Sequence, residues 1–331
     1  MMEYRTVGKT GVQVSPLCFG TMSFGGIADE EMSRKMFKAA LDRGVNFFDS
    51  ADVYNAGRSE ELLGKFMQEN NCRDELVITS KVYGKTAEDV NAQGLSRRHI
   101  KLGVEESLKR LKTDRIDFYF VHSFDSKTDM LQTLRAMDAL VKEGKILYPA
   151  VSNWAAWQIE KALGISRQES LARFELVQPM YNLAKRQAEV EILPMAESEK
   201  MGVISYSPLG GGLLTGKYGK DTRPAKGRLV ERDDYAARYG LKQYYQIAED
   251  FSNHARNRGV EPASLAVAWV MSNSAITAPI IGARNLEQLK GSLGALDIEM
   301  TEDWRKEITE LSITPPPATD RLEEQKNISY F

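Results

Sequence analysis

Short apolar runs alternate with amphipathic segments along most of this chain, and this alternation limits its possible folds more than any other feature. The runs typical of strands are VSPLCFG (14–20), NFFDS (46–50), LVITSKV (76–82), DFYFVHS (117–123), ILYPAVS (146–152), FELVQPM (174–180), GVISYSP (202–208) and AITAPIIGA (275–283). Between them, apolar side chains recur at helical spacing, as Met36, Phe37 and Ala40 do within residues 29–43. Such alternation indicates βα units and a parallel sheet.

Eight βα units favour a closed (β/α)8 TIM barrel over an open, doubly wound sheet. An open sheet of that kind would be expected to carry a Gly-x-Gly-x-x-Gly turn after its first strand, and the chain contains no such match. Barrels of this length commonly form one domain. We therefore predict a single domain over residues 1–331, with a core of about 12–311 and a C-terminal tail of about 312–331.

Two segments depart from the regular alternation. The sequence EYRTVGKTGVQVS (3–15) is typical of a β-hairpin that turns around residues 8–11, and it would cap the bottom of the barrel. Residues 209–240, after the seventh strand, are rich in Gly, Arg and Lys and predict a long loop. A loop of that length in a compact domain is usually functional or mobile.

Charge and composition exclude several classes of protein. The formal net charge is −2, and there is no basic excess of the kind that nucleic-acid binding requires. No stretch approaches the roughly 18 apolar residues of a membrane span, and MMEYRTVGKTG lacks the apolar core of a signal peptide. Cys18 and Cys72 provide neither a disulfide framework nor zinc spacing. We therefore expect a cytoplasmic protein without a metal.

Polar residues end nearly every predicted strand, which is where barrels of this kind place their active sites. Asp49 ends the second strand, Lys81 the third and His122 the fourth, while Tyr54 lies on the loop after the second. A phenol is a poor acid near neutral pH, but a nearby ammonium favours its anion. Lys81 is suited to that effect, Asp49 to holding Lys81, and a neutral His122 to orienting a substrate oxygen. This group would protonate that oxygen as hydride reached the carbonyl carbon.

A glycine-rich segment, SPLGGGLLTGK (207–217), follows the seventh strand. It has a plain interpretation as a flexible loop and a functional one as backbone that lies close to a pyrophosphate with free N–H groups aimed at it. Arg223 and Arg228 follow, and both are suited to closing over phosphates.

Taken together, these segments resemble the aldo-keto reductase family. The matching motifs are GVNFFDSADVY (44–54), ITSKV (78–82), IDFYFVHSFD (116–125), VSNW (151–154), VQPMYNL (177–183), YSPLGGGLLTGKY (206–218) and PIIGARNLEQL (279–289). The similarity runs from about residue 3 to 311, and the motifs occur in the family's order. The segment after the seventh strand is most similar to the branch of bacterial general-stress reductases and potassium-channel beta subunits.

The resemblance implies a role for each matching residue. Tyr54 would be the general acid, tuned by Lys81 and Asp49, and His122 would orient the carbonyl. The cofactor contacts implied are Thr21 and Met22 near the nicotinamide ribose, Ser152, Asn153 and Gln178 around the carboxamide, Tyr206 stacked on the nicotinamide, Ser207, Leu209, Gly210 and Gly212 along the pyrophosphate with Lys217 and Arg228 nearby, and Gly282, Arg284 and Gln288 at the adenosine end. Gly20, Asp49 and Pro208 are further cofactor contacts that the resemblance implies.

The chain departs from the family pattern at the adenine segment. Gly291 and Ser292 stand where the family commonly has Glu and Asn, which puts polar contacts to adenine in doubt. Arg284 still offers a planar cation to a 2′-phosphate, so NADP(H) is favoured over NAD(H). Asn55 replaces the usual Gly after the tyrosine, a change expected to matter little to the acid itself.

The sequence predicts a reversible NADP(H)-dependent reductase of aldehydes or ketones. The alternatives are a regulatory subunit that senses NADPH with little turnover and, less favoured, a barrel enzyme acting on a sugar phosphate. His122 distinguishes the first alternative, because it is the residue of the catalytic family members. Sugar-like and aryl carbonyl substrates both stay open, as do the oligomeric state and the physiological direction.

Overall fold

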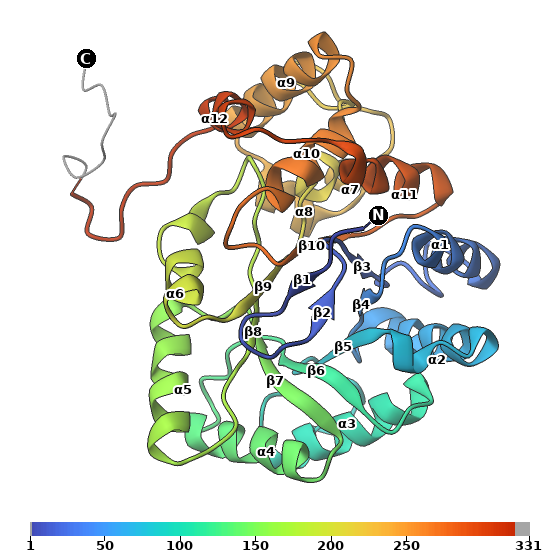
Figure 1. Ribbon diagram of the computed structural model, residues 1–331, viewed down its shortest axis with the longest axis vertical. Helices are drawn as coiled ribbons and strands as arrows, with labels where there is room; N and C mark the ends of the chain where they lie inside the picture. Colours follow the sequence, from blue (N-terminus) through green and yellow to red (C-terminus); the bar gives the residue numbers. More distant parts are fainter. Residues whose placement is uncertain (1, 322–331) are drawn as a thin grey trace.

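The computed structural model describes residues 2–321, and eight parallel strands in it close into a barrel (Figure 1). The strands are β3 (Cys18–Gly20), β4 (Phe47–Asp49), β5 (Val77–Val82), β6 (Ile116–Val121), β7 (Ile146–Ser152), β8 (Leu176–Gln178), β9 (Gly202–Ser205) and β10 (Ala278–Ile281). Each pairs with its neighbour in sequence order, and β10 pairs with β3 to complete the ring. All eight predicted strands form, and the (β/α)8 prediction is confirmed.

The predicted hairpin is also present and closes the amino-terminal end of the barrel. Its strands, β1 (Arg5–Thr6) and β2 (Gln13–Val14), are antiparallel and lie across the barrel opening in Figure 1. Val7 and Val14 are buried with Phe47 and Phe118 in one apolar cluster inside the barrel. At Gly8, φ is +50° and an added Cβ would lie 2.7 Å from backbone atoms near β9, so the turn requires glycine. The hairpin therefore plugs this end, and ligands must approach from the other.

Helices surround the barrel, and most bury one face, whereas α10 is buried on nearly all sides. Their bounds are α1 (Glu30–Asp42), α2 (Arg58–Asn70), α3 (Arg97–Leu111), α4 (Met130–Lys142), α5 (Ala156–Gln168), α6 (Ile192–Ser198), α9 (Lys242–Asn257), α10 (Pro262–Met271), α11 (Leu286–Leu293) and α12 (Glu302–Glu310). Short 3-10 turns are η1 (Tyr54–Gly57), η2 (Arg73–Glu75), η3 (Gln187–Glu189) and η5 (Gly294–Asp297). In α1, Asp29 caps the first turn by accepting from the Met32 N–H, and Phe37 faces the core.

The segment 209–240 is not the unbroken loop that its composition predicted. It contains η4 (Gly210–Gly212), α7 (Arg228–Glu231) and α8 (Asp233–Tyr239). In α8, two acidic residues begin the helix and Arg238 lies in the last turn, an order that suits the helix dipole. Tyr235 and Tyr239 are buried against the barrel. Aromatic burial therefore orders a stretch that looks like a loop from its Gly and Lys content.

The carboxyl-terminal part of the chain is described only to residue 321. Helix α12 ends at Glu310, close to the predicted start of the tail. Residues 322–331 of that tail lie outside the described residues, and the single-domain organisation stays a prediction. Within residues 2–321, the helices are too short or too polar to cross a membrane.

Candidate active site

The polar side chains predicted at strand ends lie together at the carboxyl end of the barrel. Asp49 is the last residue of β4 and Lys81 the last but one of β5, while His122 directly follows β6. Tyr54 begins η1, on the loop after β4. Since the strands are all parallel, their carboxyl ends meet at one rim. The structure therefore brings the four predicted catalytic residues to one place.

Asp49 and Lys81 form a buried ion pair at the centre of this group. Nζ of Lys81 lies 2.7 Å from Oδ2 of Asp49 and 2.6 Å from the backbone oxygen of Ser50. Oδ1 of Asp49 accepts hydrogen bonds from Oγ1 of Thr79 at 2.7 Å and from Nε2 of Gln178 at 2.9 Å. The exposed fractions are 0% for Lys81 and 2% for Asp49. These bonds fix the position of the ammonium in a buried site.

Lys81 in turn donates a hydrogen bond to the hydroxyl of Tyr54, at 3.3 Å. Burial raises the pKa of Tyr54 above its ordinary value, and the Lys81 ammonium opposes that rise. Burial alone would lower the pKa of Lys81, but Asp49 and Tyr54 hold it above its ordinary value. From the sequence we expected the Lys81 ammonium to favour the phenolate. In the structure, burial has the larger effect on the pKa of Tyr54. Tyr54 is therefore a neutral phenol that still holds its proton at neutral pH.

His122 lies beside Tyr54, with ring centres 6.1 Å apart and the rings nearly perpendicular. Its backbone N–H donates to the oxygen of Val82 at 3.0 Å, which ties it to the end of β5. Burial, followed by the charge of Lys81, lowers the pKa of His122 to about 3. The imidazole is thus neutral near pH 7 and carries one N–H that is suited to a substrate oxygen.

Asn55 has a structural role that the sequence argument missed. Its Nδ2 donates to the backbone oxygens of Met22 at 2.9 Å and Phe24 at 2.8 Å, so it joins the loop after β3 to the loop that carries Tyr54. Asn55 has φ of 50° and Ala56 has φ of 53°. Asn tolerates this left-handed region better than most residues, and that preference was the available sequence signal.

The residues expected around a carboxamide form one hydrogen-bonded cluster. Oγ of Ser152 donates to the backbone oxygen of Gln178 at 2.9 Å, and Nδ2 of Asn153 donates to Ser152 Oγ at 3.1 Å. The hydroxyl of Tyr206 donates to Oδ1 of Asn153 at 2.8 Å. Because Nε2 of Gln178 already donates to Asp49, its Oε1 is the atom suited to accept a hydrogen bond from a ligand.

Gly20, Thr21 and Met22, expected near the nicotinamide ribose, differ in what they offer. Gly20 ends β3, where an added Cβ would lie 2.8 Å from Ile280. Oγ1 of Thr21 is buried and bonded to the backbone oxygen of Asp49 and to Ser59. The Thr21 hydroxyl is thus committed to the protein, whereas the side chain of Met22 is exposed.

The glycine-rich turn after β9 departs from the expectation of free N–H groups. The Gly210 N–H donates to the oxygen of Ser207 at 2.9 Å, and the Gly212 N–H donates to the oxygen of Leu209 at 3.0 Å. Pro208 has no N–H to offer. The turn therefore satisfies these two donors itself, and what its glycines provide is space.

That space is used by α8. Gly211 has φ of +68°, and an added Cβ would lie 2.8 Å from Cδ1 of Tyr235. The Tyr235 ring thus packs directly on the glycine backbone. Helix α8 consequently covers the turn on the side that faces the site.

Three cations gather beyond this turn. Burial, followed by the charge of Arg284, lowers the pKa of Lys217, with Arg228 adding to the effect and Glu231 opposing it. Nη1 of Arg284 lies 3.6 Å from Oε2 of Glu231. The backbone N–H of Arg284 donates to Oε1 of Gln288 at 3.1 Å. Mutually repelling cations with one carboxylate among them are suited to phosphate groups.

Gly282 and Arg223 complete the predicted phosphate residues. Gly282 follows β10, and an added Cβ would have only the Gly20 oxygen within 4 Å, at 3.9 Å, so its surroundings are open. Arg223, expected to close over phosphates, instead donates to backbone oxygens of Gly219 and Thr222 and stacks 3.4 Å from the ring centre of Tyr245. In this structure the loop's own carbonyls and an aromatic ring hold the guanidinium, and its closing over phosphates stays a prediction.

A second buried acid, Asp52, was not predicted. It is 3% exposed, and neither carboxyl oxygen has a hydrogen-bond partner among residues 2–321. Burial, followed by the charge of Glu60, raises its pKa to about 7. Glu60 itself is paired with Arg110 at 2.7 Å. The sequence offers little sign that Asp52 is buried, because an acid between apolar residues is also common at the exposed rim of a barrel.

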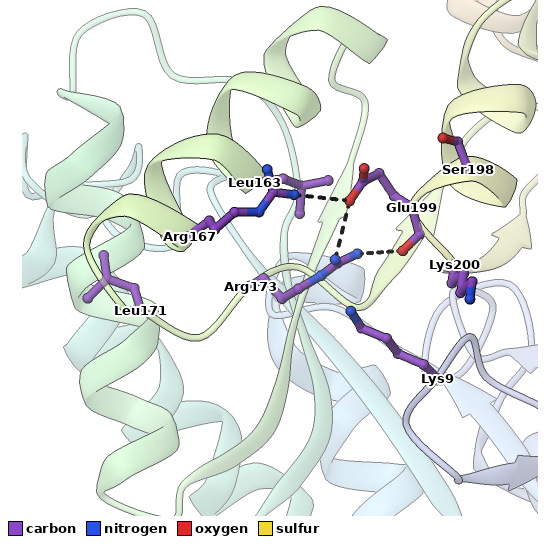
Figure 2. Close-up of a pocket in the computed structure, with 8 residues that line it drawn as sticks. All are labelled: Lys9, Leu163, Arg167, Leu171, Arg173, Ser198, Glu199 and Lys200. Carbon is purple, nitrogen blue, oxygen red and sulfur yellow. Dashed lines mark hydrogen bonds and ion pairs between the residues drawn. The ribbon is translucent and has the colours of Figure 1, made fainter.

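A surface cavity of about 380 Å³ lies at the other end of the barrel (Figure 2). Lys9, Arg167, Arg173 and Lys200 give it a basic lining, but Glu199 binds both arginines. The cavity is remote from the four predicted catalytic residues, which we call the tetrad, since Lys9 belongs to the hairpin turn and Lys200 precedes β9.

The donor set at the strand ends fits a nicotinamide dinucleotide. Asn153, Gln178 and Tyr206 match a carboxamide and its ring, and Lys217 and Arg284 match phosphates. Among the described residues, no three His, Cys, Asp or Glu side chains are grouped to hold a metal ion.

The fold and the site define a class of protein: a (β/α)8 barrel that carries an Asp–Tyr–Lys–His group and a cluster of cations at the carboxyl ends of its strands. A model of the Aldo/keto reductase family matches residues 16–313. The chain belongs to the aldo/keto reductase family, as its motifs predicted, and is an oxidoreductase of that family.

Relatives of known name match nearly the whole chain. A Bacillus subtilis protein named as an uncharacterized oxidoreductase, YrpG, is 37% identical over 91% of this chain and 93% of its own length. A probable voltage-gated potassium channel subunit beta of Arabidopsis thaliana is 35% identical, over 90% of this chain and 92% of its own. The norsolorinic acid reductase of Aspergillus flavus is 33% identical over 91% of this chain and 78% of its own. The predicted branch of the family is confirmed.

Proposed function

We propose that this protein reversibly reduces an aldehyde or ketone to an alcohol with NADP(H), and that Tyr54 supplies the proton. The observation that carries the proposal is the buried chain of contacts from Asp49 through Lys81 to the Tyr54 hydroxyl. Family membership supports carbonyl reduction as the reaction class. Relatives named as reductases support it further.

The proton would leave from the Tyr54 hydroxyl, which is neutral before the reaction. As Tyr54 gives up its proton to the carbonyl oxygen, the phenolate that forms lies beside the Lys81 ammonium and is stabilised by it. Asp49 holds Lys81 in place and keeps it charged. The neutral imidazole of His122 would donate to the same carbonyl oxygen and orient it. General acid catalysis of this kind contributes about 10²–10⁴-fold.

The bound nicotinamide would supply the hydride. Asn153 and Gln178 would hold its carboxamide, and Tyr206 would pack on its ring. Lys217 and Arg228 would bind the pyrophosphate, and Arg284 would bind a 2′-phosphate, which is why NADP(H) is proposed over NAD(H). The tetrad and the rim provide this chemistry without a metal ion.

We also propose that the protein works in the cytoplasm. Cys18 and Cys72 are both free and buried, as is usual for proteins of reducing compartments.

A second candidate function is a regulatory subunit that binds NADPH and turns over slowly. The similarity to a probable potassium channel subunit beta favours it. The presence of His122 beside Tyr54 favours catalysis instead. Steady multiple turnover of any carbonyl substrate would exclude a purely regulatory role.

The test is cofactor titration followed by turnover. NADPH and NADH are titrated in parallel while protein fluorescence is followed, and then aldehydes, ketones and keto-sugars are offered with the tighter cofactor. We expect tighter binding of NADPH and reduction of at least one compound. Tight binding without turnover on the whole panel would favour the regulatory candidate, and absence of binding of either cofactor would overturn the proposal.

A further inference from the structure

Two cations next to the proposed nicotinamide site have no acidic partner. Lys185 follows β8, and Arg238 lies in the last turn of α8, so both belong to the carboxyl end of the barrel. Both side chains are half-buried. Within residues 2–321, the contacts of their charged groups are with aromatic rings and not with carboxylates.

The rings hold the cations but leave their hydrogen-bond donors free. Nζ of Lys185 lies 5.7 Å from the ring centre of Tyr239 and 5.5 Å from that of Tyr244. The guanidinium of Arg238 lies 4.9 Å from the ring centre of Tyr235. Cation–π contacts fix position without using N–H groups. Both cations therefore stay able to bind an oxyanion.

Lys185 lies over the ring of Tyr239, the residue next to Arg238 in α8, so the two cations are close enough to repel each other. Burial lowers the pKa of Lys185, and the charge of Arg238 lowers it further. Holding like charges together in a half-buried place is unfavourable unless an anion joins them. The nearby acids are already used, since Asp234 binds Arg232 at 2.9 Å and Glu231 lies beside Arg284.

Contacts connect Lys185, through the ring of Tyr239, to Ser207, which follows Tyr206 on the nicotinamide side of the site. The Tyr239 hydroxyl accepts from Nδ2 of Asn182 at 3.1 Å, and the same Nδ2 donates to the oxygen of Ser207 at 3.0 Å. Burial raises the pKa of Tyr206, and the charge of Arg238 opposes that rise. The pair is therefore close to where a substrate would meet the cofactor.

We propose that Lys185 and Arg238 bind an anionic group of the substrate, so that the protein prefers aldehydes or ketones that carry a carboxylate or phosphate. This inference rests on the proposed reductase function. The phosphates of the cofactor already have Lys217, Arg228 and Arg284, which gather beyond the glycine turn. The carboxamide end of the cofactor, near Tyr206, has no phosphate. The substrate is thus the remaining source of an anion there.

The test compares each anionic aldehyde with its neutral ester. Para-formylbenzoate and the longer para-formylphenoxyacetate are each assayed against their methyl esters at fixed ionic strength. The measured quantity is the ratio of kcat/KM for anion and ester. In the wild type, we expect at least one ratio to favour the anion by about tenfold or more, as charged hydrogen bonds do. Arg238→Gln and Lys185→Gln should each reduce that ratio towards unity.

Controls separate this site from the cofactor site and from general charge. Lys161→Gln removes an exposed positive charge on α5 and should leave the ratio unchanged. The dissociation constant of NADPH is measured for every variant. Ratios that do not change in Arg238→Gln and Lys185→Gln would overturn the inference. So would weaker NADPH binding with an unchanged ratio, because the pair would then serve the cofactor.

A binding measurement keeps the inference testable if neither the anionic aldehydes nor their esters are reduced, an outcome that would count against the proposed function instead. Terephthalate, which has no carbonyl to reduce, is titrated into the protein with NADP⁺ present while protein fluorescence is followed. We expect saturable binding that weakens about tenfold in Arg238→Gln and not in Lys161→Gln. Equal binding by both variants would contradict an anion site at this pair.

Discussion

Single residues in this protein carry charge in places from which water is excluded. The ion pair of Asp49 and Lys81 is fully enclosed, and its hydrogen bonds leave the ammonium directed at Tyr54. Removing one member of such a pair typically costs about 3–5 kcal/mol, because the other charge stays buried alone. The geometry that supports acid chemistry is therefore also a condition for folding.

The burial of Asp52 leads to a prediction of how the free energy of unfolding depends on pH. Its pKa in the folded protein is about 7, raised first by burial and then by Glu60, against about 3.9 in an unfolded chain. The folded state thus binds more protons between these values, so the free energy of unfolding falls as pH rises from about 4 to about 7. Asp52→Asn cannot ionise and should exceed the wild type by about 2–4 kcal/mol at about pH 8.

Denaturant unfolding at several pH values measures this difference. Other charged or titratable groups that face Asp52 are Arg110, Lys81 and Tyr119, and all stay in the variant. The gain should shrink towards about pH 3, where the wild-type carboxyl is mostly protonated in both states. Asp42→Asn, an exposed carboxyl, is the matched control and should follow the wild-type profile. A gain that is independent of pH would contradict the assignment.

The sequence located the tetrad because strand ends can be found from apolar runs alone. It did not locate the groups that hold the tetrad. Thr79 bonds Asp49 because the register of β4 and β5 places these residues opposite each other, and register is not visible in one strand. Asp52 was missed because its burial depends on the packing of α2 and α3.

At the scale of elements, the strands and the first helices follow from periodicity, whereas the segment after β9 does not. Its many charged residues predict an exposed loop, and the sequence therefore gives no sign that Tyr235 and Tyr239 are buried and hold α8 against the barrel. The close contact of Tyr235 with Gly211 is a feature of tertiary packing. Helix α8 is consequently the element that sequence reasoning was least able to predict.

That contact predicts the effect of a single methyl group. Gly211→Ala would place a Cβ 2.8 Å from the Tyr235 ring, in addition to left-handed strain at φ of +68°. Gly144→Ala is a matched control, since its φ is +71° and nothing lies within 4 Å of the added Cβ. We expect Gly144→Ala to cost about 1–2 kcal/mol of stability.

Gly211→Ala should cost more and should also displace α8. Limited proteolysis, with cleavage mapped across residues 220–240, measures the displacement, and thermal unfolding measures the stability. Faster cleavage in Gly211→Ala than in Gly144→Ala is the expected result. The same cleavage rate in both variants would show that Tyr235 does not hold the helix on the turn.

At the scale of the whole molecule, the proposed cofactor site extends across the carboxyl end of the barrel. One end is the cluster at β7 and β8, and the other is the group of Lys217, Arg228 and Arg284 beyond β9 and β10. The hairpin closes the opposite end, so the barrel has one functional face. This arrangement followed from the sequence, because parallel strands direct all their carboxyl ends to the same side.

The Arg284→Ala variant tests the proposed preference for NADPH over NADH. The guanidinium is proposed to meet the 2′-phosphate that distinguishes NADPH from NADH, and charged hydrogen bonds are worth about 1.5–3 kcal/mol. We expect NADPH affinity to fall by at least about tenfold, with a much smaller loss for NADH, in parallel fluorescence titrations. Arg167→Ala, at the cavity of Figure 2, is the control and should change neither. Equal losses for both cofactors would rule out the 2′-phosphate contact.

The most direct test of the account is the turnover of Tyr54→Phe, measured with a carbonyl compound that the wild type reduces. The variant keeps the ring and loses the hydroxyl that Lys81 contacts. Tyr148→Phe, which removes a hydroxyl that donates to the backbone oxygen of Thr10 at the closed end of the barrel, is the control. We predict that Tyr54→Phe binds NADPH as the wild type does and loses about 10²–10⁴-fold in kcat, while Tyr148→Phe keeps its rate. A Tyr54→Phe variant with close to the wild-type kcat would contradict the account.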